Sequence, residues 1–264
     1  MGDEIAGAAV TADRDGLARP SLFIVALARS LSSIVYHAVR RALALREPAW
    51  TTDGEILNVR RFALLAEEGD VEGVKYVERH RDGQRFDRLL GFLDQVARRE
   101  GFAYKDVIQP FLVAEWLPGS GLPVLYIDRP VPDVAYAMLQ RGWHYPAAAG
   151  GAWPPTDAAV ASGSEASAAA GRDAEGLRRA LVAGLIRARH ALAAVPAARV
   201  LYDDLIHDEA PLHAALGSLY GGEPARPAYL DDAFRRDRDE VLQRRESDLH
   251  RRLATLCREI EEAP

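Results

Sequence analysis

The chain has 264 residues, with 33 Lys or Arg against 39 Asp or Glu, which gives a net charge of −6 at pH 7. This length can bury a core without disulfides or metal staples, and a single cysteine excludes an internal disulfide. The negative charge argues against nucleic acid as the partner. The longest apolar run, residues 22–28, is far too short to span a bilayer, and the acidic first residues do not resemble a signal peptide. We therefore expect a cytoplasmic protein that binds neither membrane nor nucleic acid.

Composition divides the chain into a tail and one domain. Residues 1–19 are rich in Ala, Gly and Asp and predict a flexible N-terminal tail, whereas residues 20–264 predict a single domain. Within that domain, residues 146–176 contain almost no large apolar side chain. Such a segment buries too little surface to offset its ordering entropy, so we expect a flexible insertion, with the length of a lid over a bound acceptor.

The pattern of apolar residues predicts alternating strands and helices. Short apolar runs predict buried parallel strands at 22–27, 107–108, 124–128 and 199–202. Helical periodicity predicts helices from Ser32 or Ser33 to Leu43 and at 86–100, 111–117, 133–141, 177–194, 212–220 and, as one long charged helix, 232–262. This alternation favours an α/β fold, a three-layer sandwich with a mainly parallel sheet. Ligands of such sheets bind beyond the carboxyl ends of the strands.

The clearest functional signal is the polar segment after the first strand, Arg29-Ser30-Leu31-Ser32-Ser33. A helix that begins at Ser32 or Ser33 directs free N–H groups and its dipole at an anion above the loop, and Arg29 adds a positive charge. The pattern GxxxxGK[ST] is absent and the loop has no lysine, which disfavours Mg²⁺-dependent ATP or GTP hydrolysis. The alternative is that a serine only caps a core helix.

Residues 22–33 resemble the 5′-phosphosulfate-binding loop of sulfotransferases that use 3′-phosphoadenosine 5′-phosphosulfate (PAPS). Three further segments resemble that family in the same order: Asp53-Gly54-Glu55 its Gly-Glu segment, 124–136 its 3′-phosphate strand and helix, and 200–205 its Tyr-Glu-Asp-Leu segment. The resemblance spans roughly residues 20–250. It implies a P-loop-like sulfotransferase fold and transfer of a sulfuryl group from PAPS to a hydroxyl or amine of a small-molecule acceptor, without a metal.

The resemblance also implies roles for individual residues. The 5′-phosphosulfate is expected to contact Arg29, Ser30, Leu31, Ser32, Ser33 and Ile34. Arg29 and the loop N–H groups would stabilise the charge on the oxygen that leaves sulfur. Arg129 would bind the 3′-phosphate, the alternative being a salt bridge with Asp128 or Asp133. Glu55 is the candidate general base, the alternative being a carboxylate that favours a helix dipole.

Two positions depart from the family pattern. Leu31 stands where the family usually has glycine, and Ala137 stands where it usually has a serine that binds the 3′-phosphate. Leucine does not readily take the positive φ that glycine allows, and alanine offers no hydroxyl. Two other functions therefore stay open: a P-loop-like group transferase with another nucleotide donor, and a non-catalytic nucleotide-binding scaffold that kept the fold.

A few further residues carry weaker predictions. Lys105 is one of only two lysines and could place an ammonium near the donor, although a solvated position at a strand start is the simpler interpretation. His144 and His37 are further candidate bases. Asp203 and Asp204 are interpreted as structural, without a metal. The charged run 235–245 is interpreted as a solvated helix face, and the C-terminal helix could pack against a second copy in a homodimer.

Overall fold

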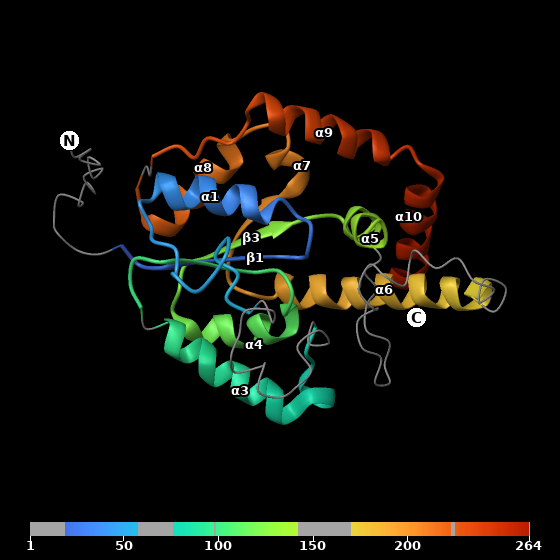
Figure 1. The fold of residues 1–264 in the computed structure, drawn as a ribbon, viewed down its shortest axis with the longest axis horizontal. Coiled ribbons are helices and arrows are strands. Elements are labelled where there is room, and N and C mark those ends of the chain that lie inside the picture. Colours follow the sequence, from blue (N-terminus) through green and yellow to red (C-terminus); the bar gives the residue numbers. More distant parts are fainter. Residues whose placement is uncertain (1–18, 58–75, 98, 142–169, 223–224, 264) are drawn as a thin grey trace, which may run out of the picture.

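The computed structural model describes residues 19–57, 76–97, 99–141, 170–222 and 225–263 (Figure 1). The predicted tail up to residue 18 and His144 lie outside these ranges, as do residues 146–169 of the predicted insertion. Among the described helices, none combines the length and the apolar character needed to cross a membrane.

A single parallel sheet lies at the centre of the fold, and its strands follow the order β2-β1-β3-β4. The strands are β1 (Leu22–Ala26), β2 (Ala103–Asp106), β3 (Val124–Asp128) and β4 (Ala198–Leu201). Ile24 of β1 lies beside Lys105 of β2 on one side and Leu125 of β3 on the other. All four strands are parallel, so their carboxyl ends meet at one edge of the sheet, and the predicted α/β class is confirmed.

Helices cover both faces of the sheet (Figure 1). One face carries α1 (Ser32–Ala42) and α8 (Ala210–Tyr220). The other face carries α3 (Arg79–Ala97), α4 (Pro110–Ser120) and α6 (Ala170–Ala193). The remaining helices are α5 (Val131–Leu139), α7 (Tyr202–Leu205), α9 (Asp232–Arg244) and α10 (Asp248–Glu261). This layering is consistent with the three-layer arrangement predicted from the sequence.

The two central strands are the best-predicted elements. Every residue of β1 and of β3 is buried, as expected for strands that helices cover on both sides. Their continuous apolar sequences exclude water from the middle of the sheet and fix where the loops after Ala26 and Asp128 emerge.

The short strand predicted at 107–108 is wrong, because β2 lies just before it at Ala103–Asp106. The apolar pattern does not indicate this strand, because it contains Lys105 and Asp106 and two charged residues are unusual in a buried segment. Both side chains are nevertheless almost completely buried, at 0% and 2% exposure. At the other edge of the sheet, Tyr202 begins α7 instead of ending the fourth strand.

The C-terminal region also differs from the prediction. The single helix predicted over 232–262 is in fact two helices, because the chain turns between Arg244 and Asp248. Ser247 caps the second helix, and its hydroxyl accepts a hydrogen bond from the backbone N–H of His250 at 3.2 Å. Residues 170–176, the last part of the insertion predicted over 146–176, form the beginning of α6.

Candidate functional site

The loop between β1 and α1 has a strained backbone. Arg29 has φ 67° and Leu31 has φ 61°, so two non-glycine residues within three positions take the left-handed conformation. This conformation costs an L-residue about 1–2 kcal/mol. Leu31 precedes α1 and provides no side-chain cap, so the first N–H groups of the helix have no partner from a cap. Local strain beside unpartnered backbone donors is typical of anion-binding loops.

The serines of this loop have different environments. Ser30 is completely buried, and its hydroxyl has no hydrogen-bond partner among the described residues. Ser32 is buried in the first turn of α1, whereas Ser33 and Ile34 are half-buried. The hydroxyl of Ser33 accepts a hydrogen bond of 2.8 Å from Lys105. Ser30 is thus the loop hydroxyl that is free to bind a ligand.

Lys105 reaches this loop from the neighbouring strand β2. Its ammonium donates to Ser33, lies 3.2 Å from a carboxylate oxygen of Glu55, and stands 5.7 Å from the centre of the Tyr36 ring. The interpretation of Lys105 as a solvated residue is therefore wrong. A buried ammonium needs such partners to offset its lost hydration. The β1–α1 loop has no lysine of its own, but β2 supplies one to its first helical turn.

The Asp53-Gly54-Glu55 turn lies beside Lys105. The backbone oxygen of Gly54 accepts the N–H of Lys105 at 2.8 Å. Gly54 has φ +68°, and a Cβ there would come within 2.2 Å of the Tyr36 ring, so only glycine fits between the turn and α1. The close contact fixes Asp53 and Glu55 beside the first two turns of α1.

Asp53 forms a second polar pair in this region. One of its carboxylate oxygens lies 2.9 Å from Nε2 of His37, and Ser33 also forms a side-chain hydrogen bond with it. Burial raises the pKa of Asp53, but the hydrogen bonds from His37 and Ser33 and the charge of Lys105 outweigh it, so the pKa lies below its ordinary value. Asp53 is thus held as a carboxylate that orients His37, whose side chain is 36% exposed.

On the other side of the loop, Arg129 follows the carboxyl end of β3. Its side chain is 7% exposed, donates a hydrogen bond to the backbone oxygen of Arg29, and stacks on the ring of Tyr202 at 4.2 Å. Burial lowers the pKa of Arg129 below its ordinary value. Its Nε forms an ion pair with Asp133 at 4.0 Å, which is one of the two alternatives predicted for Arg129. This distance is too long for a hydrogen bond, and Nε has no hydrogen-bond partner among the described residues.

The predicted alternative of a salt bridge between Arg129 and Asp128 is wrong. Asp128 is completely buried and is bound by Arg189 at 2.8 Å and by Arg199, which join α6 and β4 to the end of β3. Burial raises the pKa of Asp128, but hydrogen bonds from the two arginines outweigh this effect and leave the pKa below its ordinary value. Asp128 is therefore structural, and Arg129 faces elsewhere.

A cavity of about 10 Å³ lies beside Arg129, and the carboxylate of Asp133 lines it together with basic side chains. Its walls include Tyr136 and Ala137 of α5, Arg244 of α9 and His250 of α10. Partial burial lowers the pKa of Arg29, and the charges of Arg141 and Arg244 lower it further. Arg244 is 48% exposed and is ion-paired with Glu240 at 2.9 Å. Ala137 contributes no hydroxyl to this cavity.

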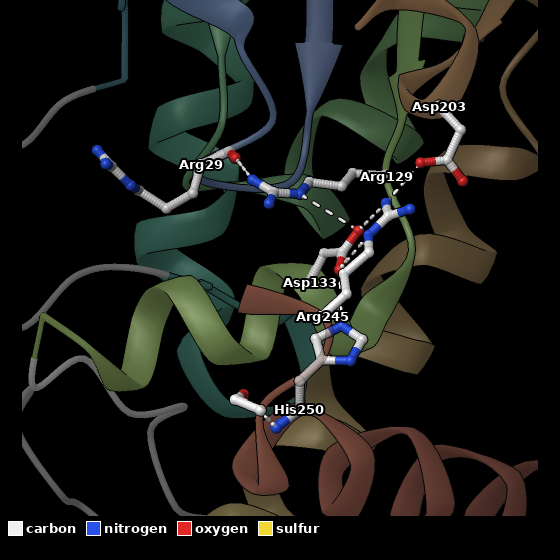
Figure 2. Close-up of polar contacts among 7 residues, drawn as sticks. Arg29, Arg129, Asp133, Asp203, Arg245 and His250 are labelled. Atoms are coloured by element: carbon white, nitrogen blue, oxygen red, sulfur yellow. Dashed lines mark hydrogen bonds and ion pairs between the residues drawn. The ribbon is translucent and has the colours of Figure 1, made fainter. Parts of the chain in front are cut away.

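The structure thus brings the predicted residues to two sides of one loop. Arg129 lies on the β3 side, whereas Glu55 lies on the β2 side with Lys105 (Figure 2 shows the β3 side). The side chain of Arg29 is exposed and points away from Arg129, although its backbone oxygen is the point of contact (Figure 2).

Sequence reasoning missed three contributions to this region. Asp53 lies within the Asp53-Gly54-Glu55 segment but was not singled out, and its signal is the turn that Gly54 fixes against α1. Arg244 and Arg245 belong to the run interpreted as a solvated helix face, and this is wrong for Arg245, which binds Asp133 and Asp203. The cap residue Ser247 is the signal that the helix stops there. Among the described residues, no cluster of His, Cys, Asp and Glu could hold a metal ion.

A second and wider cavity, of about 340 Å³, lies between the first turns of α3 and α4. Phe86 and Phe111 provide apolar walls, and Arg79, His80 and Glu115 provide polar ones. The chain just before α3 is attached to the end of β2, because the N–H of Tyr76 donates to the backbone oxygen of Ile108 at 2.8 Å. This cavity therefore opens near the same edge of the sheet as the loop.

No protein-family model matches this chain, and no curated protein is detectably similar to it. The structure thus shows an α/β protein in which the buried side chains of Lys105 and Arg129 lie beside the loop at the carboxyl edge of the sheet.

Proposed function

We propose that this chain is a PAPS-dependent sulfotransferase with a P-loop-like fold that acts on a small-molecule acceptor. The observation that carries the proposal is the buried guanidinium of Arg129, whose Nε lacks an acceptor among the described residues. Such a donor is costly unless a ligand supplies the acceptor. Arg129 touches the strained β1–α1 loop, so one ligand with two anionic groups could contact both.

The residues present offer donors to both phosphates of PAPS, and the cavity of about 10 Å³ beside Arg129 would have to widen to admit the 3′-phosphate. The 3′-phosphate would bind Arg129, and Arg244 stands where the wall lacks a serine hydroxyl because of Ala137. The 5′-phosphosulfate would bind the buried hydroxyl of Ser30 and the first N–H groups of α1. Leu31 already has the left-handed backbone that glycine usually provides, so its presence is compatible with a phosphate-binding loop.

In the proposed reaction, the acceptor atom forms a bond to sulfur while the bond between sulfur and the bridging phosphate oxygen breaks. The electron pair of that bond goes to the bridging oxygen. Lys105 delivers a positive charge to Ser33 in the first turn of α1, next to where this negative charge develops. Fixed donors of this kind stabilise a transition state without further reorganisation.

The acceptor must also lose a proton. Glu55 as general base stays a prediction, but the ammonium of Lys105 at 3.2 Å stabilises its carboxylate and gives it a positioning role. His37 is half-exposed, is oriented by the carboxylate of Asp53, and carries a second ring nitrogen that can take a proton. We therefore assign proton removal to His37, with Glu55 holding Lys105 in place.

The wider cavity between α3 and α4 is the proposed acceptor site. Its volume of about 340 Å³ falls within the range of small-molecule pockets. Two phenylalanine walls favour an acceptor with an apolar or aromatic portion, and the polar side chains around them favour one with a hydroxyl or amine.

The proposal is tested by incubating the protein with PAPS and a panel of phenols, alcohols and amines, and by measuring 3′,5′-adenosine bisphosphate (PAP) and sulfated product. We expect transfer that Arg129→Ala abolishes and that the control Arg252→Ala, an exposed residue of α10, does not. Transfer from another nucleotide would instead support the alternative transferase, and the missing hydroxyl at Ala137 would then explain the changed donor. Binding of a nucleotide without any transfer would support the scaffold.

A further inference from the structure

Asp133 lies in the first turn of α5 and is 3% exposed, yet three cationic or potentially cationic side chains surround it (Figure 2). Arg245 binds it through two nitrogens, one of them Nε at 3.1 Å. Nε2 of His250 lies 2.7 Å from Oδ1 of Asp133, the same oxygen that accepts the hydrogen bond from Nε of Arg245. Arg129 stands farther away, at 4.0 Å. The carboxylate is thus held by the C-terminal helices more tightly than by Arg129.

The turn between α9 and α10 makes this arrangement possible. Arg245 follows the last residue of α9, and the chain turns there before Ser247 caps α10. Arg245 also reaches Asp203 of α7 at 2.5 Å. Burial lowers the pKa of Arg245, but hydrogen bonds to Asp133 and Asp203 outweigh it and leave the pKa above its ordinary value. Arg245 is therefore an ion-pair residue, whereas Arg129 is a buried cation with an unused donor.

The distance between Asp133 and Arg129 means that the carboxylate and a bound anion would compete for the same guanidinium. A carboxylate at about 4 Å attracts a guanidinium strongly when both are buried. If Arg245 and His250 did not hold Asp133, its charge would act on Arg129 and repel an anion that approaches the same guanidinium. The binding energy of such an anion therefore depends on residues that need not touch it.

We propose that Arg245 and His250 are positioning residues that set the anion affinity of Arg129 by neutralising Asp133. The anion is a phosphate monoester or a similar tetrahedral oxyanion. The inference rests on the proposed function only in naming the 3′-phosphate of PAP as that anion. The carboxylate of Asp133 competes with the anion for Arg129, and the α9–α10 turn holds Arg245 and His250 in contact with that carboxylate.

The test is calorimetric titration of the full chain with PAP and, separately, with inorganic pyrophosphate. Arg245→Met should weaken both by roughly tenfold or more, because an unpaired carboxylate then faces Arg129. Arg245→Lys should keep the affinity within about threefold, since it keeps the charge. Asp133→Asn in the Arg245→Met background should restore the wild-type affinity to within about threefold, a result that a merely structural role would not give.

Two further variants complete the test: one is a control, and the other replaces Arg245→Met if that variant does not fold. Arg252→Met removes an exposed arginine of α10 and should leave the affinity unchanged. If Arg245→Met does not fold, Asp133→Asn alone should tighten binding of both ligands, and weaker binding would overturn the inference.

The inference is also overturned if Arg245→Met binds PAP as tightly as the wild type does, or if adding Asp133→Asn does not restore the lost affinity. In both cases, binding of PAP still supports the proposed function. If pyrophosphate follows the expected pattern but PAP does not bind, the inference stands and the proposed function fails. If neither ligand binds, both fail.

Discussion

Asp106 makes the stability of this protein depend on pH. Its side chain is 2% exposed at the end of β2, where one carboxylate oxygen accepts the N–H groups of Ile108 and Gln109. Burial raises the pKa of Asp106 from 3.8 to about 7, against the effect of the N–H donor of Gln109, and the charge of Glu55 adds to the increase. Asp106→Asn keeps an acceptor for the N–H groups and removes the charge.

The direction of the pH dependence follows from the pKa of Asp106 in the unfolded chain, 3.8, and in the folded protein, about 7. Below pH 4 the carboxyl is neutral in both states. Between about pH 4 and pH 7 it ionises in the unfolded chain but stays protonated when folded, so the wild type loses stability as pH rises. Above pH 7 both states are ionised and the loss levels off. A displacement of about three pH units corresponds to roughly 4 kcal/mol.

The assay is urea unfolding of the wild type and Asp106→Asn from pH 4 to pH 8. We expect the variant to gain on the wild type by roughly 4 kcal/mol over this range, mostly below pH 7. Asp237→Asn, which removes an exposed carboxylate of α9, serves as the control. A difference between Asp106→Asn and the wild type that stays constant with pH would refute the reasoning.

Three other substitutions have definite expected outcomes. Leu31→Gly relieves the left-handed strain at the cost of half-buried packing, so we expect stability within about 1 kcal/mol of the wild type and tighter PAP binding, measured by thermal unfolding and calorimetry; weaker binding would contradict this. Lys105→Met should lower the free energy of unfolding, measured with urea, by about 3–5 kcal/mol, because it leaves the carboxylate of Glu55 unpaired. Adding Glu55→Gln should recover part of this loss. No recovery would show that Glu55 does not need the ammonium. His37→Gln should slow single-turnover transfer by roughly 100-fold or more, with His207→Gln as the exposed control. An unchanged rate would return the role of general base to Glu55.

The central strands and the loop after β1 could be predicted because their signals are local. Leu22–Ala26 is a continuous apolar run and Val124–Asp128 is apolar up to its last residue, and such runs form buried parallel strands with few competing possibilities. Arg129 directly follows one of these runs, so its place at the carboxyl edge also follows from the sequence.

The charged residues of the site could not be predicted because their partners are distant in the chain. Lys105 is buried only because Ser33 and Glu55 converge on β2, and this depends on β2 lying next to β1. Arg245 lies in a run that continues a helical pattern, and its partner Asp133 is 112 positions away in the chain.

The most direct test of the central claim is calorimetric titration of the wild type and Arg129→Ala with PAP, with ATP and AMP as controls. The account predicts micromolar binding of PAP by the wild type, loss of that binding in Arg129→Ala, and no comparable binding of the two nucleotides without a 3′-phosphate. Absence of PAP binding, a preference for ATP, or PAP binding that persists in Arg129→Ala would contradict it.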